Sequence, residues 1–292
     1  MVCRLCPRNC GAQRTQQRGE GYCRMPELPV LARAALHHWE EPPISGVRGS
    51  GTVFFSGCCL GCVFCQNEKI SHQDFGRAVT QDRLEEICQA LIAQGAHNLN
   101  FVNPTHYAHV LGALLESWRP PVPVVFNTGG YDRVETLRGL EGRVDVYLPD
   151  LKYLNGDTAR RCSGVEDYPE IAAAAIREMV RQTGPCVLDG DGLLIRGTVI
   201  RHLILPGQVS QAKAVMDWVS REFEPGTVLF SLMSQYTPWG DLSACPELNR
   251  RLRPGEIRAA QEYMQNLGLD GFVQERTSAR EEYTPPFDLT GV

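Results

Sequence analysis

Three cysteines in a short, glycine-containing segment are the residues with the clearest chemical potential in this sequence. Cys58, Cys62 and Cys65 fall within eight residues, and Gly57 and Gly61 interrupt the same segment. Three thiolates so close together can bind a cubane [4Fe-4S] cluster and leave its fourth iron without a protein ligand. An iron with an open position can take part in chemistry, so the spacing predicts a reactive cluster. A structural zinc site is the alternative.

Cys59 offers a second set of three thiols together with Cys62 and Cys65. In that set two residues separate each cysteine from the next, as in part of a ferredoxin loop. Such a loop also needs a fourth cysteine followed by proline, and none lies nearby. We therefore predict that Cys58, Cys62 and Cys65 are the ligands and that Cys59 is a spare thiol.

Four further cysteines, Cys3, Cys6, Cys10 and Cys23, lie close to the beginning of the chain. Four thiolates suit either a tetrahedral zinc ion or an auxiliary [4Fe-4S] cluster with no open iron, and the spacing does not separate the two. A lobe this short could scarcely fold without a metal. We therefore expect a second metal site, holding zinc or iron–sulfur, in this segment.

The elements that must position these residues alternate between short β-type segments and longer helical ones from Thr52 onward. This alternation is typical of βαβ units around a parallel sheet, and it predicts an α/β fold. The predicted strands span residues 52–56, 98–102, 122–126, 144–148, 198–205, 227–232 and 271–274. The predicted helices span the segment from the N-cap Thr80 to Gly95, then residues 168–183, 210–223 and 255–267.

The chain divides into three segments by composition. We predict a cysteine-rich metal-binding lobe over residues 1–25, a connector rich in proline and glycine over 26–50, and the main α/β domain over 51–292. Barrel-like βα folds place their active sites at the carboxyl ends of the strands. The loops that follow the predicted strands are therefore expected to carry the site.

Composition excludes several classes of protein. The 292 residues are 43% hydrophobic, but no apolar run approaches the roughly 20 residues that cross a bilayer. The first 25 residues contain four cysteines and five arginines and do not resemble a secretory signal, so we expect a cytoplasmic protein. A net charge of −5 gives no reason to expect binding to nucleic acid or to an anionic membrane.

The cysteine segment resembles the radical S-adenosylmethionine superfamily, whose CxxxCxΦC motif has an aromatic residue where Phe64 stands. Residues 49–58 and 65–67 look like the opening segment of the pyruvate formate-lyase activating enzyme family. Residues 150–152 resemble that family's DxK segment, and residues 201–207 resemble its RHxxLPG segment. The motifs at residues 3–8 and 38–43 indicate an activase-like, PflX-type subgroup. The resemblance implies a partial (β/α)6 TIM-like barrel that follows the small N-terminal metal-binding lobe.

The resemblance also implies the chemistry. The open iron would be chelated by the amino and carboxylate groups of S-adenosylmethionine, and one electron would break the carbon–sulfur bond of that cofactor. A 5'-deoxyadenosyl radical would then abstract hydrogen from the substrate. A one-electron donor such as flavodoxin or ferredoxin would reduce the cluster.

Site residues can be assigned from the strand ends and from the matching motifs. For several of them a structural role is the alternative: Thr105 could cap a helix, Asp150 and Lys152 could form a solvated ion pair, and His202 could be a core histidine. Cys245 is expected to donate a hydrogen atom to a substrate radical. The residues expected to act in catalysis are Lys152, His202 and Cys245. Those expected to bind the cofactor are Phe64, Asn103, Thr105, Asn127, Asp150, Lys152, Arg201 and Gln235.

Three hypotheses about function follow. The first is an activase that installs a glycyl radical on a protein partner, and the second is a radical enzyme that modifies a small molecule or a peptide. The third is a zinc-stapled binding protein without catalysis. The sequence contains no fingerprint that identifies the substrate.

Overall fold

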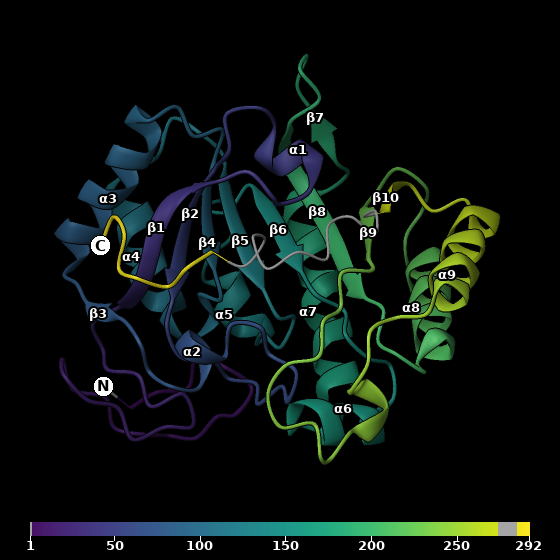
Figure 1. Cartoon of the computed structure of the whole chain (residues 1–292). Helices are drawn as coiled ribbons and strands as arrows, with labels where there is room; N and C mark the ends of the chain where they lie inside the picture. Colours follow the sequence, from purple (N-terminus) through teal and green to yellow (C-terminus); the bar gives the residue numbers. More distant parts are fainter. Residues whose placement is uncertain (1, 274–284) are drawn as a thin grey trace.

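Seven mutually parallel strands form the centre of the molecule (Figure 1). The computed structural model describes residues 2–273 and 285–292. Within those residues the sheet has the strand order β10-β9-β8-β6-β5-β4-β2-β1-β3, with β7 paired to β8. The strands are β1 (Val30–His37), β2 (Ser50–Phe55), β3 (Arg77–Ala78), β4 (Leu99–Val102), β5 (Val124–Thr128), β6 (Val146–Pro149), β7 (Val187–Leu188), β8 (Leu194–Leu203), β9 (Leu229–Met233) and β10 (Gly271–Val273).

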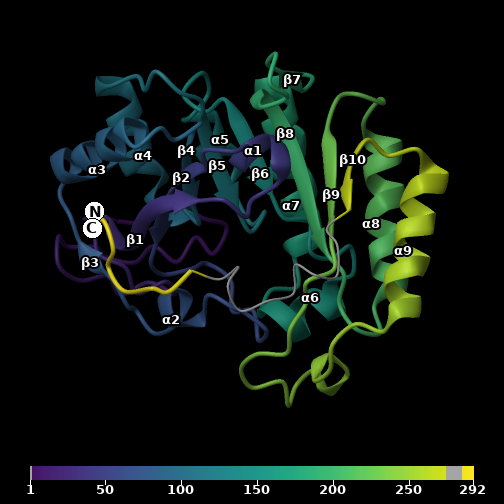
Figure 2. The same cartoon turned by 45° about the horizontal axis from the view of Figure 1, so that its top comes forward.

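The helices cover the outer face of this sheet. Helices α7 and α8 pack on β8, and α9 packs on α8 beyond the last strands. Figure 2 shows α8 and α9 together at one end of the sheet, with α3 and α4 at the other. The helices are α1 (Pro42–Ser45), α2 (Glu68–Ser71), α3 (Gln81–Ala93), α4 (Ala108–Ser117), α5 (Val134–Arg138), α6 (Gly156–Ser163), α7 (Tyr168–Thr183), α8 (Val209–Glu222) and α9 (Pro254–Leu267), with the 3-10 turns η1 (Thr105–Tyr107) and η2 (Pro246–Leu248).

The predicted α/β class and the partial barrel are confirmed. All six pairings that join β2, β4, β5, β6, β8, β9 and β10 are parallel. The sheet is not closed among the described residues, because no pairing joins β10 to β1 or β3. An incomplete barrel of this kind leaves a lateral opening between its first and last strands.

The predicted strands lie within a few residues of the observed ones. Strand β5 begins two residues later than predicted because Pro123 has no backbone N–H to donate to a neighbouring strand. The last predicted strand extends to Gln274, which lies outside the described residues. Among the helices, α3 has the predicted N-cap, since the Thr80 hydroxyl accepts a hydrogen bond from the backbone N–H of Arg83.

Strand β1 is the main element that the sequence did not predict. It lies inside the segment expected to be a connector, and it pairs antiparallel with β2. Its sequence, Val-Leu-Ala-Arg-Ala-Ala-Leu-His, consists mostly of good helix formers, so local propensity opposes a strand there. The C-terminal residues run along its other edge, where the backbone N–H of Ala34 donates to the carbonyl of Thr290.

The carboxyl ends of the parallel strands face α2 and α6, at the lower edge of the sheet in Figure 1. The N-terminal segment, coloured purple, lies on the same side of the molecule. Within its described residues it forms only isolated bridges, between Val2 and Gln13 and between Arg14 and Gly19. The cysteine-rich segment is therefore placed next to the edge where the site is expected.

Candidate active site

The loop that carries the three clustered cysteines leaves β2 at its carboxyl end. Gly57 begins the turn with a φ of 79°, a left-handed conformation that suits glycine. The backbone N–H groups of Gly61 and Val63 donate to the carbonyls of Ser163 and Cys162, at 3.0 Å each. These bonds tie the loop to the carboxyl end of α6, so two distant parts of the chain fix its shape.

Each of the three thiols has a hydrogen-bonding neighbour. Such groups beside cysteine sulfurs stabilise thiolates and tune iron–sulfur clusters. The pairs are Cys58 Sγ with the backbone N–H of Leu60 at 3.4 Å, Cys62 Sγ with the hydroxyl of Ser163 at 3.0 Å, and Cys65 Sγ with the hydroxyl of Ser71 at 3.5 Å.

The electrostatics of the loop favour Cys58 as a thiolate. A hydrogen bond with the side chain of Cys59 has the largest effect on Cys58 and lowers its pKa. Burial raises the pKa of Cys62, and it raises that of Cys65 to about 12. The positive charge of Lys152 favours the thiolate of both Cys58 and Cys62, although burial outweighs it at Cys62, so this ammonium group lies near the loop.

Cys59 has different surroundings. Its side chain is buried, and its Sγ donates to the carbonyl of Tyr131 at 3.6 Å. It belongs to the hydrophobic cluster that also contains Cys6 from the N-terminal segment. That this thiol is not a ligand stays a prediction.

The donor set at this loop fits a [4Fe-4S] cluster. In such a cluster each thiolate binds its own iron, so three cysteines leave one iron open. Among the described residues, no three Cys, His, Asp or Glu side chains are gathered around a position that could hold one metal ion. Three hydrogen-bonded thiols on one glycine-containing loop therefore suit a cluster better than a structural zinc ion.

The residues after β4 lie directly beside the cysteine loop. Asn103 has a left-handed φ of 59°, and its side-chain amide donates to the carbonyl of Gly57. Thr105 is 1% exposed, and its hydroxyl donates to Asp132 at 2.6 Å. Thr105 begins η1, whose N-terminus has no side-chain cap, so it does not have the capping role considered as an alternative. Burial raises the pKa of Asp132 to about 6.

Asp150, Lys152 and Arg201 form a buried charge network at the ends of β6 and β8. Lys152 Nζ bonds to one carboxylate oxygen of Asp150, and Arg201 Nε lies 2.9 Å from the other. All three side chains are less than one-fifth exposed, so this is not a solvated ion pair. Burial alone would raise the pKa of Asp150, but Lys152 and then Arg201 hold it below its ordinary value. The predicted placement of Asp150 and Lys152 on one side of the segment is confirmed.

Glu40 joins this network from the segment that follows β1. Its Oε2 lies 3.3 Å from Arg201 Nη1, and its Oε1 accepts from the side-chain amides of Asn100 at 3.2 Å and Asn127 at 3.3 Å. Arg201 also donates to Asn127 Oδ1 at 2.6 Å, so the expected site residue Asn127 bridges both groups. Burial raises the pKa of Glu40. The sequence reasoning missed Glu40 and Asn100, and the only local signal was the paired Glu40-Glu41 before two prolines.

A cavity of about 860 Å³ opens inside the partial barrel beside this network. Residues 37–41 line it on one side, and the strand end at Met233 and Gln235 and the whole of β10 line it on the other. Arg201 and Asn127 reach it from the sheet, and Gln66 and Asn67, which directly follow Cys65, also contribute. The space therefore extends from the charge network to the cysteine loop, and it is large enough for a small-molecule ligand.

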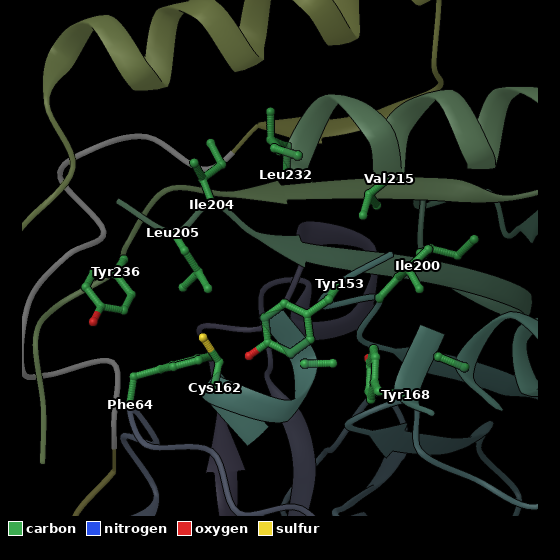
Figure 3. Packing of buried hydrophobic residues seen from close by; sticks show 14 of the residues in the cluster. Phe64, Tyr153, Cys162, Tyr168, Ile200, Ile204, Leu205, Val215, Leu232 and Tyr236 are labelled. Carbon is green, nitrogen blue, oxygen red and sulfur yellow. The ribbon is translucent and has the colours of Figure 1, made fainter. Parts of the chain in front are cut away.

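Three of the expected site residues lie elsewhere. Phe64 is buried and packs edge-on against Tyr236, with ring centroids 6.0 Å apart (Figure 3). His202 is 2% exposed and points to the opposite face of β8 from Arg201, where its Nδ1 contacts the carbonyl of Leu151 at 2.7 Å. Cys245 is fully buried, 3.4 Å from the sulfur of Cys162. Their expected roles stay predictions.

The N-terminal cysteines are not gathered around one ion in the described residues. Cys3 and Cys6 are buried, Cys23 is half-buried and Cys10 is exposed. The segment nevertheless packs on the cysteine loop, because Arg8 Nε donates to the carbonyl of Cys59 at 2.8 Å. The second metal site stays a prediction.

Comparison with known proteins supports the cluster and the fold. Residues 45–146, which include the cysteine loop, match the family model of a 4Fe-4S single cluster domain and confirm the expected [4Fe-4S] cluster. The crystal structure of Streptococcus suis SuiB bound to S-adenosylmethionine has a TM-score of 0.51 at 14% identity, covering 79% of this chain and 52% of SuiB. A second SuiB structure gives the same TM-score and identity, covering 80% and 50%. The chain spans about half the length of the SuiB chains that it matches.

The chain therefore shares the fold of SuiB, which agrees with the partial barrel that the sequence motifs predicted. The uncharacterized protein MJ0674 of Methanocaldococcus jannaschii is 30% identical over 277 residues, which cover 92% of this chain and 75% of that protein. The chain belongs to the same family as this protein. The activase-like subgroup is a finer assignment that these comparisons do not reach.

No helix among the described residues is long and apolar enough to cross a membrane.

Proposed function

We propose that the protein is a radical enzyme that uses S-adenosylmethionine. Cys58, Cys62 and Cys65 would hold a [4Fe-4S] cluster, which, once reduced, supplies the electron that cleaves S-adenosylmethionine to methionine and a 5'-deoxyadenosyl radical. The observation that carries the proposal is the continuity of one cavity from the cysteine loop to the buried charge network. Radical chemistry requires the reacting hydrogen atom to be held close and away from stray donors, and this cavity is large enough to hold a substrate in that way.

The residues of the charge network have defined tasks in this proposal. Lys152 carries a positive charge beside Cys58 and Cys62, and it is suited to neutralising the carboxylate of the cofactor. Asp150 holds Lys152 and Arg201 in place through its two carboxylate oxygens. Asn103, fixed against the carbonyl of Gly57, keeps the end of β4 close to the loop. These groups orient the cofactor, while the cavity below them receives the substrate.

The proposal is tested by iron counts and by product analysis. The protein is reconstituted anaerobically, reduced by a one-electron donor such as flavodoxin, ferredoxin or dithionite, and assayed for 5'-deoxyadenosine. Wild type is compared with a triple variant in which Cys58, Cys62 and Cys65 are changed to Ala. We expect the triple variant to lose the iron of this cluster and all formation of 5'-deoxyadenosine.

The matched control is Cys186→Ala, which removes a half-buried thiol on the segment before β7. This variant should keep the iron content and the cleavage activity of wild type. Full iron retention in the triple variant would exclude these three ligands. Wild-type protein that takes up no iron and cleaves no cofactor would favour the zinc-stapled binding protein.

The nature of the substrate is a finer proposal, and it rests on the resemblance of residues 150–152 and 201–207 to the activase motifs. An activase should produce a glycyl-radical signal in electron paramagnetic resonance when it is mixed with its protein partner, cofactor and reductant. A radical enzyme for small molecules or peptides should instead form 5'-deoxyadenosine faster when that compound alone is added.

A further inference from the structure

Glu41 stands out among the residues around the cavity because it forms no salt bridge among the described residues, and the only cation that acts on its carboxylate is Arg201, which Asp150 and Glu40 also share. The residue is 1% exposed, and its Oε2 has no hydrogen-bond partner among the described residues. Asp150 is paired with Lys152 and Arg201, and Glu40 is paired with Arg201. With Glu41 the network holds three carboxylates and two cations, and all three carboxylates share the charge of Arg201. A buried charge without a partner is costly unless a ligand neutralises it.

Two other unpartnered acceptors belong to this region, since Gln235 lines the cavity and Asn100 contacts Glu40. Asn100 Oδ1 and Gln235 Oε1 are buried and have no hydrogen-bond partner. The orientation of the Asn100 amide is fixed, because its Nδ2 donates to Glu40. The Ser231 hydroxyl lies near Glu41 and lowers its pKa by a hydrogen bond, but it brings no positive charge. The oxygens Glu41 Oε2, Asn100 Oδ1 and Gln235 Oε1 all lack a donor, and a ligand group with several N–H donors could satisfy them.

The depth of this position separates it from the cofactor. Asn100 precedes Asn103 by three residues along β4, a rise of roughly 10 Å in a strand. Asn103 contacts Gly57, which directly precedes the first cluster cysteine. Glu40 accepts a hydrogen bond from Asn100, so it lies roughly 10 Å from the cysteine loop along the strand direction. Glu41 is the next residue in the chain and lies at a similar depth. This is the floor of the cavity rather than its cluster end.

His37, which lines the cavity, does not supply a further positive charge. Burial lowers the pKa of His37 to about 4, so its imidazole is neutral near pH 7. Burial is also the main influence on Glu41 and raises its pKa, and the charge of Arg201 opposes this shift. A cation seated against Glu41 would favour the ionised carboxylate.

We propose that the floor of the cavity at Glu41 binds a cationic nitrogen group of the substrate, an ammonium or a guanidinium. The inference rests on the proposed function, because it assigns the cavity to the substrate of the radical reaction. It names the chemical class of that substrate as one with a positively charged nitrogen group. The group is carried either by a small amine or by a basic side chain of a peptide.

The test measures binding, so it needs no reductant and no turnover. The probes are methylguanidinium and its neutral isostere methylurea, titrated into the anaerobically reconstituted full-length protein with S-adenosylmethionine bound. Ligand-observed saturation-transfer NMR follows each titration. We expect saturable binding of methylguanidinium and binding of methylurea that is at least about ten-fold weaker. Equal binding of the two probes would overturn the proposal without any variant being made.

Glu41→Gln keeps the shape of the side chain and removes its charge. We expect it to weaken methylguanidinium binding at least about ten-fold and to leave the affinity for S-adenosylmethionine unchanged. The matched control is Glu85→Gln on α3, far from the cavity in sequence and fold, which should bind both ligands as wild type does. Loss of cofactor affinity with unchanged probe binding would place Glu41 in the cofactor site and would contradict the inference.

Two further arms separate the sources of the cation. Agmatine represents a small amine, and acetyl-Gly-Arg-Gly amide represents a basic side chain in a peptide. Binding of either one that depends on Glu41 supports the proposal. Formation of 5'-deoxyadenosine without substrate is measured on the same preparations. Its absence in wild type would count against the proposed radical function, whereas probe binding independent of Glu41 would count only against the cationic site.

Discussion

At the scale of single residues, burial decides which charges remain available for chemistry. Arg201 is shared between Asp150 and Glu40, so it can orient those carboxylates but has little freedom to leave them. Lys152 is held by Asp150 alone and lies near the cysteine loop. Removing one partner of such a buried set typically costs several kcal/mol, because a charge is left unpaired. The network therefore keeps its members fixed and holds Lys152 near the cysteine loop.

His202 gives a prediction about pH at this scale. Burial lowers its pKa from 6.5 to about 4, although the contact with the Leu151 carbonyl opposes this shift. Between these values the unfolded chain binds a proton that the folded protein does not, so stability is lost as the pH falls from about 6.5 to about 4. From pH 7 to pH 5 the contribution is about 2 kcal/mol.

The measurement is anaerobic urea unfolding at pH 7, 6 and 5. His202→Gln keeps a donor for the Leu151 carbonyl but does not titrate, so its stability should fall less steeply with decreasing pH. His72→Gln changes a half-buried histidine at the end of α2 and should keep the wild-type slope. An unchanged slope in His202→Gln would show that this imidazole is not the buried neutral group described here.

At the scale of elements, the strand ends are held together by close backbone approaches. Gly129 and Gly130 directly follow β5. In the structure Gly130 has a φ of 81°, and a Cβ there would stand 2.1 Å from the carbonyl oxygen of Asp150. The Tyr168 hydroxyl lies within hydrogen-bond distance of both the Gly129 and the Asp150 carbonyls. Gly130 thus sets how closely the end of β5 packs on the segment that carries Lys152.

Gly130→Ala should therefore destabilise the protein by about 3 kcal/mol, the combined cost of a left-handed alanine and of overpacking against backbone. Gly142→Ala is a close control, because Gly142 has a φ of 75° with no atom within 4 Å of an added Cβ. It should cost only about 1 kcal/mol. Urea unfolding measures the free energy of unfolding of both variants. Equal losses would show that the close contact between position 130 and the Asp150 carbonyl does not add to the cost of the substitution.

At the scale of the whole molecule, the N-terminal segment and the cysteine loop form one packed unit. Arg14 is buried and donates to the carbonyl of His106 at 2.7 Å, which links the segment to η1. A Cβ at Gly57 would stand 2.2 Å from Cγ of Met25, so the segment also packs closely against the turn before the cluster. The segment covers one side of the loop whether or not it binds a metal of its own.

Deletion of residues 2–25 should expose the cysteine loop and shorten the lifetime of its cluster in air, measured as the decay of iron–sulfur absorbance. If the four N-terminal cysteines bind a second metal, the deletion also removes zinc or iron beyond that of the cluster. A variant with Cys3 and Cys6 changed to Ser separates the two effects, because it should lose the second metal and keep most of the cover. Unchanged metal content in both proteins would contradict a second site.

The sequence by itself determined the features that depend on local spacing. Three cysteines within eight residues specified the cluster loop, hydrophobic periodicity specified most of the parallel strands and long helices, and the alternation of an extended segment placed Asp150 beside Lys152. These features need only neighbouring residues, so one sequence is enough to predict them.

Only the tertiary structure decided which distant residues meet. Glu40 contacts Arg201 across 161 positions of sequence, and the strand β1 that leads to Glu40 was hidden by residues that favour helix. His202 follows Arg201 in the chain, yet the two side chains leave the sheet on opposite faces. The charge balance around Glu41 depends on how Arg201 is shared among three carboxylates. Such a balance is a property of the assembled barrel, because the groups that could neutralise a buried charge come from elements far apart in the sequence.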